Sequence, residues 1–171
     1  MEFVLISDFS DFRVKSIFKA YCDTFPEAER RSKAQFENLF EQETVKIFSI
    51  LNDADFIGYF IIWELDGFVF LEHFEIFQSF RNKNLGSGVL KKLVQTYPNV
   101  ILETETEKLN AEAPKRIIFY QNNGFHKILD SYVQPSYGEG KESLQLLLFA
   151  NFQPENLEMI TENIYDVVYG K

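Results

Sequence analysis

The hydrophobic and polar positions in the first forty residues predict a strand and two helices. Glu2–Ile6 is a short apolar run typical of a strand. Ser10 and Asp11 are good N-caps for a following helix that Pro26 ends. The apolar stripe expected on that helix is Phe12, Ile17, Phe18, Tyr21, Cys22 and Phe25. Phe36, Leu39 and Phe40 follow at helical spacing and predict the second helix.

The middle of the chain predicts three antiparallel strands. Thr44–Leu51, Phe56–Leu65 and Phe68–Phe77 are rich in β-branched and aromatic residues. Asn52–Asp55 and Asp66-Gly67 separate them, and both are short turn sequences. Short turns join neighbouring antiparallel strands, so we expect a meander.

The spacing becomes helical after Gln78. Leu85, Val89 and Leu93 repeat with a helical period until Pro98, and a short apolar strand follows at Val100–Thr104. A strand, a helix and a strand in this order predict a parallel crossover. The remaining segments predict a helix from Pro114 to Asn123, strands at Phe125–Gln134 and Ser143–Phe149, and a last helix from Leu157.

These elements predict one α+β domain over residues 1–171. Its mixed sheet should have six or seven strands, an antiparallel meander followed by the parallel β-α-β crossover, with helices flanking it. A chain of 171 residues is long enough to bury a substantial core.

Composition excludes several classes of function. The net charge of −9 argues against nucleic-acid binding. Cys22 is the one cysteine, and the two histidines have no ligand spacing, so we expect neither a disulfide nor a metal site. No run approaches the roughly 20 apolar residues of a membrane span, and no basic segment precedes the first apolar run. We therefore expect a cytoplasmic protein with no membrane partner.

One segment has the opposite charge. No acidic residue lies between Glu75 and Glu103, whereas Arg81, Lys83, Lys91 and Lys92 are basic. Within this segment, a loop that contains Gly86 and Gly88 directly precedes a predicted helix. The first backbone amides of a helix lack hydrogen-bond partners within it and can bind an anion. It matches neither a Walker A loop nor a complete dinucleotide fingerprint. The sequence predicts a phosphate-binding loop of another kind.

Two sequence motifs, one of them in this loop, resemble those of a known protein family. Phe80–Leu90, read as x-R-x-K-x-L-G-S-G-x-L, resembles the R/Q-x-x-G-x-G/A element of the GCN5-related N-acetyltransferases (GNAT). Phe119–Phe125 resembles the F-Y-x-x-x-G-F element of the same family, and the order of predicted elements agrees. A helix expected over Tyr21–Arg31 also looks like the family's substrate-side element.

The resemblance implies an N-acetyltransferase. Such an enzyme moves an acetyl group from acetyl-CoA to an amine of a small molecule or peptide, by direct attack in a ternary complex. The strand before the loop would splay from its neighbour and present its amides to the pantetheine. The cofactor-binding residues that the resemblance implies are Phe74, Glu75, Ile76, Arg81, Asn82, Lys83, Asn84, Leu85, Gly86, Ser87, Gly88 and Tyr120.

The sequence offers one candidate for the catalytic acid and several for the catalytic base. Tyr120 matches the family's tyrosine and is expected to protonate the departing thiolate. Glu72 is the first choice for the base, because apolar neighbours would raise the pKa of an unpaired carboxyl group. Glu103 and Glu105 are rivals, and a mechanism without a dedicated base is left open.

Some questions stay open at this stage. Ala113 and Arg116 stand where many family members have Asn and Ala, and Asn110 is a candidate substitute for the Asn. The acidic residues Glu27, Glu29, Glu37 and Glu41 favour a cationic acceptor. Arg30 and Arg31 favour an anionic one. The alternatives are a non-catalytic acyl-CoA sensor or regulatory module, an anion-binding scaffold unrelated to CoA and, for assembly, a homodimer.

Overall fold

A seven-stranded sheet forms the centre of the protein in the computed structural model, which describes all 171 residues. The strand order is β1-β2-β3-β4-β5-β7-β6, and only β4 and β5 pair in parallel. The strands are β1 (Glu2–Ile6), β2 (Val45–Asn52), β3 (Asp55–Leu65), β4 (Phe68–Ile76), β5 (Val100–Glu105), β6 (His126–Gln134) and β7 (Leu144–Ala150). The predicted meander and parallel crossover are therefore confirmed.

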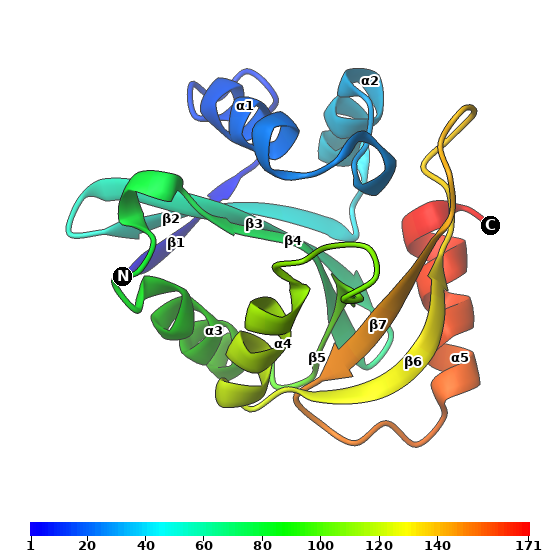
Figure 1. Cartoon of the computed structure of the whole chain (residues 1–171). Helices are drawn as coiled ribbons and strands as arrows, with labels where there is room; N and C mark the ends of the chain where they lie inside the picture. The colour runs from blue at the N-terminus through cyan, green and yellow to red at the C-terminus, as the bar shows by residue number, and fades with distance from the viewer.

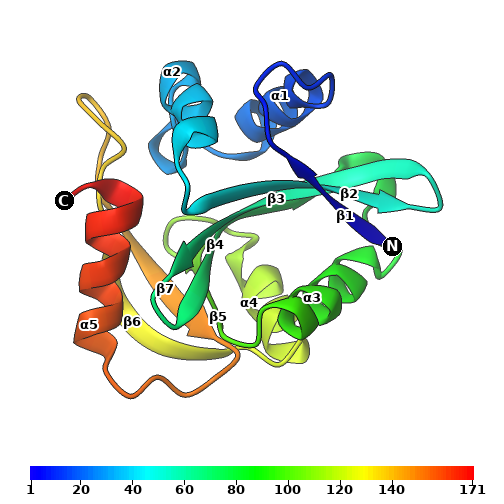
Figure 2. The same ribbon diagram turned by 180° about the vertical axis from the view of Figure 1, so that it is seen from behind.

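Helices cover both faces of this sheet, as Figures 1 and 2 show from opposite sides. The helices are α1 (Val14–Thr24), α2 (Lys33–Glu37), α3 (Leu85–Thr96), α4 (Ala113–Asn122) and α5 (Leu157–Asn163). A π-helical segment, Ile164–Tyr169, continues α5. One apolar core lies beneath α1, α2 and the C-terminal helix, and a second lies beneath α3 and α4.

The central strand β3 explains why the sheet has two cores. Its residues Ile57–Trp63 are buried without interruption, so both faces of the strand are covered. A continuous apolar run rather than strict alternation is what a strand covered on both faces requires. In β2, by contrast, Lys46 and Phe48 are half-buried between buried neighbours.

The strands β4 and β5 separate soon after they meet. Their register contains only three pairs and ends at Leu71 opposite Leu102. At the same level β4 has a bulge, because Ile61 pairs with His73 and Ile62 pairs with Leu71, which leaves Glu72 without a partner in β3. The splay expected of the strand before the loop is present, and it exposes one edge of β4.

The N-terminal segment corrects two sequence predictions. The first helix begins at Val14 without a side-chain cap, and Phe12 is 84% exposed rather than part of the apolar stripe. Asp11 instead accepts a hydrogen bond from the Arg13 amide at 2.9 Å and pairs with the Arg13 guanidinium. The chain beyond Thr24 is not helical up to Arg31, apart from a 3₁₀ turn at Glu27–Glu29.

Two further observations complete the fold. A capping box that the sequence analysis missed starts α2, where Ser32 accepts from the Gln35 amide and Gln35 accepts from the Ser32 amide. None of the helices combines the length and apolar character that a membrane crossing needs.

Candidate functional site

The predicted phosphate loop leads directly into helix α3. Asn82 and Asn84 both have positive φ angles, and the helix begins at Leu85 immediately after them. Gly86 has an ordinary φ, but a Cβ atom there would lie 3.1 Å from Cζ of Phe119 in α4. The glycine therefore allows α3 and α4 to pack closely at this point. The first amides of α3 remain free for an anion.

A cleft of about 930 Å³ runs from this loop along β4 to α4. Most of the sequence-predicted cofactor residues line it. They are Phe74, Glu75, Ile76, Arg81, Asn82, Asn84, Leu85, Gly86, Ser87 and Tyr120. Lys83 and Gly88 do not line the cleft: the Lys83 ammonium lies 5.4 Å from the centre of the Phe80 ring, and Gly88 faces the Met1 side chain.

The open edge of β4 presents backbone amides to the cleft. The Phe77 amide donates to the Ile57 carbonyl at 2.9 Å. Bonding alternates along an antiparallel pair, so the Glu75 amide also points toward β3. The amides of Phe74 and Ile76 then point toward the edge that β5 has left. Donors in this position suit the amide-rich arm of coenzyme A.

Arg81 is held against the end of the same strand. Its Nε donates to the Ile76 carbonyl at 2.8 Å, and its Nη2 pairs with Glu75 Oε1 at 3.1 Å. Thr24 of α1 donates to the same Glu75 oxygen at 2.7 Å. Arg81 is exposed, so the guanidinium contributes positive charge to the mouth of the cleft while it orders the turn after β4.

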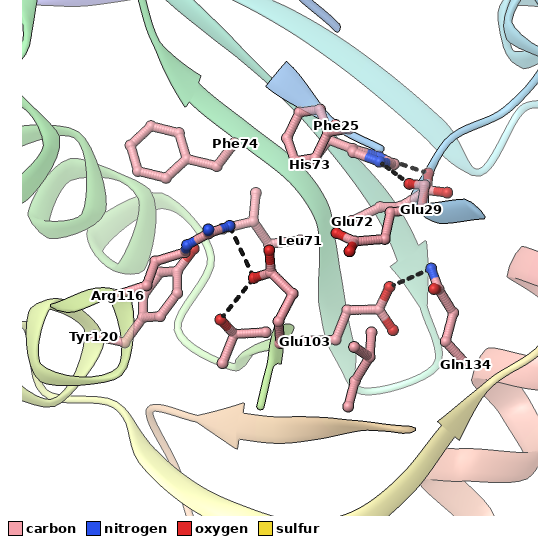
Figure 3. A pocket seen from close by; sticks show the side chains of 13 residues that line it. Phe25, Glu29, Leu71, Glu72, His73, Phe74, Glu103, Arg116, Tyr120 and Gln134 are labelled. Carbon is pink, nitrogen blue, oxygen red and sulfur yellow. Dashed lines mark hydrogen bonds and ion pairs between the residues drawn. The ribbon is translucent and has the colours of Figure 1, made fainter. Parts of the chain in front are cut away.

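A second, smaller cavity of about 60 Å³ lies deeper between β4 and β5 (Figure 3). Four carboxyl groups line it, those of Glu29, Glu72, Glu103 and Glu105. Phe25, Phe74, Arg116 and Tyr120 line both cavities, so the two spaces meet at these residues. Tyr120 is buried, and burial raises the pKa of its hydroxyl group to about 12, which keeps the proton on the oxygen at neutral pH.

Glu72 does not have the environment that the sequence analysis expected. Its Oε1 accepts from the Arg31 guanidinium at 3.0 Å and from the Tyr137 hydroxyl at 2.8 Å, and its Oε2 accepts from the Trp63 indole at 2.7 Å. Burial alone would raise the pKa of Glu72, but the Arg31 charge, the neighbouring His73 and the hydrogen bond from Trp63 together hold it below its usual range. The expected rise in its pKa is wrong.

Two other carboxyl groups of the cavity have raised pKa values. Burial raises the pKa of Glu103 to about 8, and the charges of Glu72 and Glu29 add to this shift. Burial, followed by the charge of Glu105, raises the pKa of Glu29 to about 7. Glu103 was a sequence-based candidate for the base, whereas Glu29 was expected only to attract a cationic acceptor. The one available signal was its position after Pro26, in the segment that resembles the family's substrate-side element.

Arg116, at one of the departures from the family motif, and Asn110 both contact Glu105. Arg116 forms an ion pair with Glu105 at 2.8 Å, and Asn110 donates to the other Glu105 oxygen at 3.0 Å. Asn110 and Arg116 both line the large cleft. The Arg116–Glu105 pair therefore joins α4 to β5 at the junction of the two cavities.

Comparison with known proteins agrees with this geometry. Residues 14–125 match the family model described as the acetyltransferase (GNAT) family. A protein of Bacteroides thetaiotaomicron assigned to the GNAT acetyltransferases superposes with a TM-score of 0.92 at 27% identity, covering 100% of this chain and 99% of that one. The search of curated proteins found no match.

Two more distant solved structures share the fold and contain the cofactor. A GNAT acetyltransferase of Elizabethkingia anophelis with acetyl-CoA bound has 17% identity and a TM-score of 0.51, covering 70% of this chain and 82% of that one. A Bacillus subtilis acetyltransferase in complex with CoA has 11% identity and a TM-score of 0.62, with coverage of 90% and 99%. The motifs, the splayed strands and the family match lead to one conclusion: this chain is an acyltransferase that belongs to the GNAT family.

Proposed function

We propose that this acyltransferase moves an acetyl group from acetyl-CoA to the amine of a small molecule by direct attack in a ternary complex. The observation that carries the proposal is the meeting of the two cavities at Tyr120 and Phe74. The large cleft has the length and the donors for acetyl-CoA, and the small cavity has acidic groups for an amine. Both substrates would then be present together, as direct transfer requires.

The cofactor contacts follow from the open edge and the loop. The pyrophosphate would lie at the first turn of α3, where Gly86 and Ser87 present amides and the helix dipole favours an anion. The pantetheine would pair with the amides of Phe74 and Ile76. An acyl carbonyl near these donors would be polarised toward attack.

Each proton in the transfer has an assigned place in this proposal. The amine nitrogen forms a bond to the acyl carbon, and the bond from that carbon to sulfur breaks. Tyr120 gives its proton to the departing thiolate, since a hydroxyl group with a pKa of about 12 is protonated beforehand. Glu29 takes the proton that the amine loses, because its pKa of about 7 matches the working pH of a general base.

Glu72 has a positioning role in this proposal. Both of its oxygens are occupied by Arg31, Tyr137 and Trp63, so neither is free to accept the amine proton. The Arg31 guanidinium also donates to the Val168 carbonyl at 2.8 Å, which links the C-terminal helix to the same cluster. The cluster therefore fixes the floor of the cavity.

Thermal unfolding with acetyl-CoA tests the proposed cofactor site. Ligand at about 100 times its dissociation constant adds roughly 2.7 kcal/mol, which corresponds to a rise of about 5–11 °C for a chain of this size. Ser87→Glu places a negative charge at the phosphate position and should abolish the rise. Ser87→Ala keeps the amide and should preserve it. Equal shifts in both variants, or none in the wild type, would contradict the assignment.

A further inference from the structure

The small cavity has hydrogen-bond acceptors without partners. Glu103 Oε2 and Gln134 Oε1 are buried and have no partner in the protein, and both residues line the cavity. The Tyr132 hydroxyl, a buried donor without a partner, does not line the cavity. A buried acceptor that remains unpaired is costly, so the two acceptors in the cavity favour a ligand that donates.

The orientation of Gln134 follows from its other contacts. Its Nε2 donates to Glu103 Oε1 at 3.0 Å, and the Tyr169 hydroxyl donates to the same oxygen at 2.8 Å. With Glu103 Oε1 accepting both hydrogen bonds, the amide nitrogen of Gln134 faces Glu103 and its oxygen faces elsewhere. Gln134 is only 2% exposed, and that oxygen has no hydrogen-bond partner in the protein.

The cavity also has more carboxyl groups than cationic side chains to neutralise them. Arg31 neutralises Glu72, and Arg116 neutralises Glu105. Glu29 and Glu103 have no cationic partner. Burial of Glu103 without a partner raises the pKa of its carboxyl group, and a cation bound beside it would restore the charged form.

The cavity has two distinct ends. Tyr120 and Arg116 lie at the junction with the acetyl-CoA cleft. Figure 3 shows the Glu103 carboxyl group turned away from Tyr120 and toward Gln134. A volume of about 60 Å³ holds roughly four to six groups the size of water. The cavity therefore has room for an acceptor of about four to six non-hydrogen atoms.

We propose that the acceptor is a short aliphatic diamine. One amine is acetylated at the Tyr120 end, and the second binds as an ammonium group to Glu103 Oε2 and Gln134 Oε1. An ammonium group has donors only, and it meets both unpaired acceptors and the uncompensated charge of Glu103. Leu71 and Leu146 line the cavity and would contact the methylene groups. This inference rests on the proposed function.

The inference also excludes one class of acceptor. Arg31, a sequence-based candidate for binding an anionic group, is 9% exposed and committed to Glu72 and Val168. Arg116 is committed to Glu105. No free cation therefore faces the cavity, and an amino acid carboxylate would meet acceptors and negative charge. Gln134 and Tyr169 lie outside the residues that match the family model, so the match does not cover this end of the cavity.

Calorimetric titration of amines into the CoA-saturated protein tests the diamine. The acceptors are 1,3-diaminopropane, n-butylamine, which has the same number of non-hydrogen atoms, and β-alanine, which ends in a carboxylate. We expect the diamine to bind at least about tenfold tighter than n-butylamine, or about 1.4 kcal/mol, and β-alanine not to bind. Equal affinity for the two amines, or binding of β-alanine, would overturn the proposal.

Variants identify the binding position. Glu103→Gln should bring the affinity ratio of the two amines close to one, whereas Glu107→Gln, which removes an exposed charge nearby, should leave the ratio unchanged. Gln134→Met removes the amide oxygen and provides a second test should Glu103→Gln not fold. A ratio that survives both changes refutes the position. If CoA itself does not bind, the proposed function fails, and titration into the free protein still decides whether the diamine is preferred.

Discussion

Replacement of Glu72 by Gln separates a structural role from a catalytic one. In the native protein, Arg31 and Tyr137 donate to one Glu72 oxygen and Trp63 donates to the other. Gln keeps the shape but has a single acceptor oxygen. Its amide nitrogen must then face either the guanidinium and hydroxyl donors or the indole donor, and Arg31 loses its counter-charge.

The expected loss of stability is large because every group is buried. The side chains of Glu72 and Arg31 are 0% and 11% exposed. Removal of one partner from a buried ion pair costs about 3–5 kcal/mol, since the other charge remains uncompensated. For a chain of this size the unfolding temperature should fall by roughly 6–20 °C.

The pH dependence follows from the lowered pKa of Glu72. Burial opposes ionisation, but the Arg31 charge, His73 and the hydrogen bond from Trp63 together outweigh it, so the folded pKa lies below the ordinary value of 4.5. A depressed carboxyl pKa stabilises the folded state fully above the unfolded pKa. The difference in stability between the native protein and Glu72→Gln should therefore be largest above about pH 4.5 and shrink as the pH falls further.

Calorimetry and kinetics on the same preparations complete this test. Glu64→Gln, an exposed position on β3, should leave the unfolding temperature within about 1 °C of wild type. CoA release from acetyl-CoA and an accepted amine gives the activity. An unfolding temperature unchanged in Glu72→Gln, with a large fall in kcat and loss of the rise with pH, would refute this reasoning and restore Glu72 as the base.

Three further predictions concern the proposed reaction. Tyr120→Phe should lower kcat for CoA release by about 10²-fold or more while the thermal shift with acetyl-CoA remains; unchanged turnover would exclude an acid role. The wild-type kcat/KM should rise as the pH increases through about 7, because Glu29 accepts a proton only when ionised, and Glu29→Gln should remove that rise in a pH–rate profile. Tyr169→Phe removes a hydrogen bond that favours the charged form of Glu103, so the Glu103 pKa should increase in a carbon-13 NMR titration, and a fall would contradict the contact.

The sequence by itself determined the order and type of the main elements. Alternation, turn residues and helical spacing are local properties, so the meander, the crossover and helix α3 were predictable within a few residues. The loop at Gly86 and the Tyr120 motif were equally local, and they identified the family. Local patterns failed where competing signals occur, since Phe12 has helical spacing yet precedes the helix.

The tertiary structure alone decided which carboxyl groups lack a cationic partner. Glu72 and Glu103 are both glutamates on apolar strands, and nothing local distinguishes them. Arg31, which is far away in sequence, neutralises Glu72 and leaves Glu103 uncompensated. Ionisation depends on burial and on charges brought together from distant segments, so only the folded chain determines it. For the same physical reason, the Gln134–Glu103 contact proposed to select the acceptor became visible only in the folded protein.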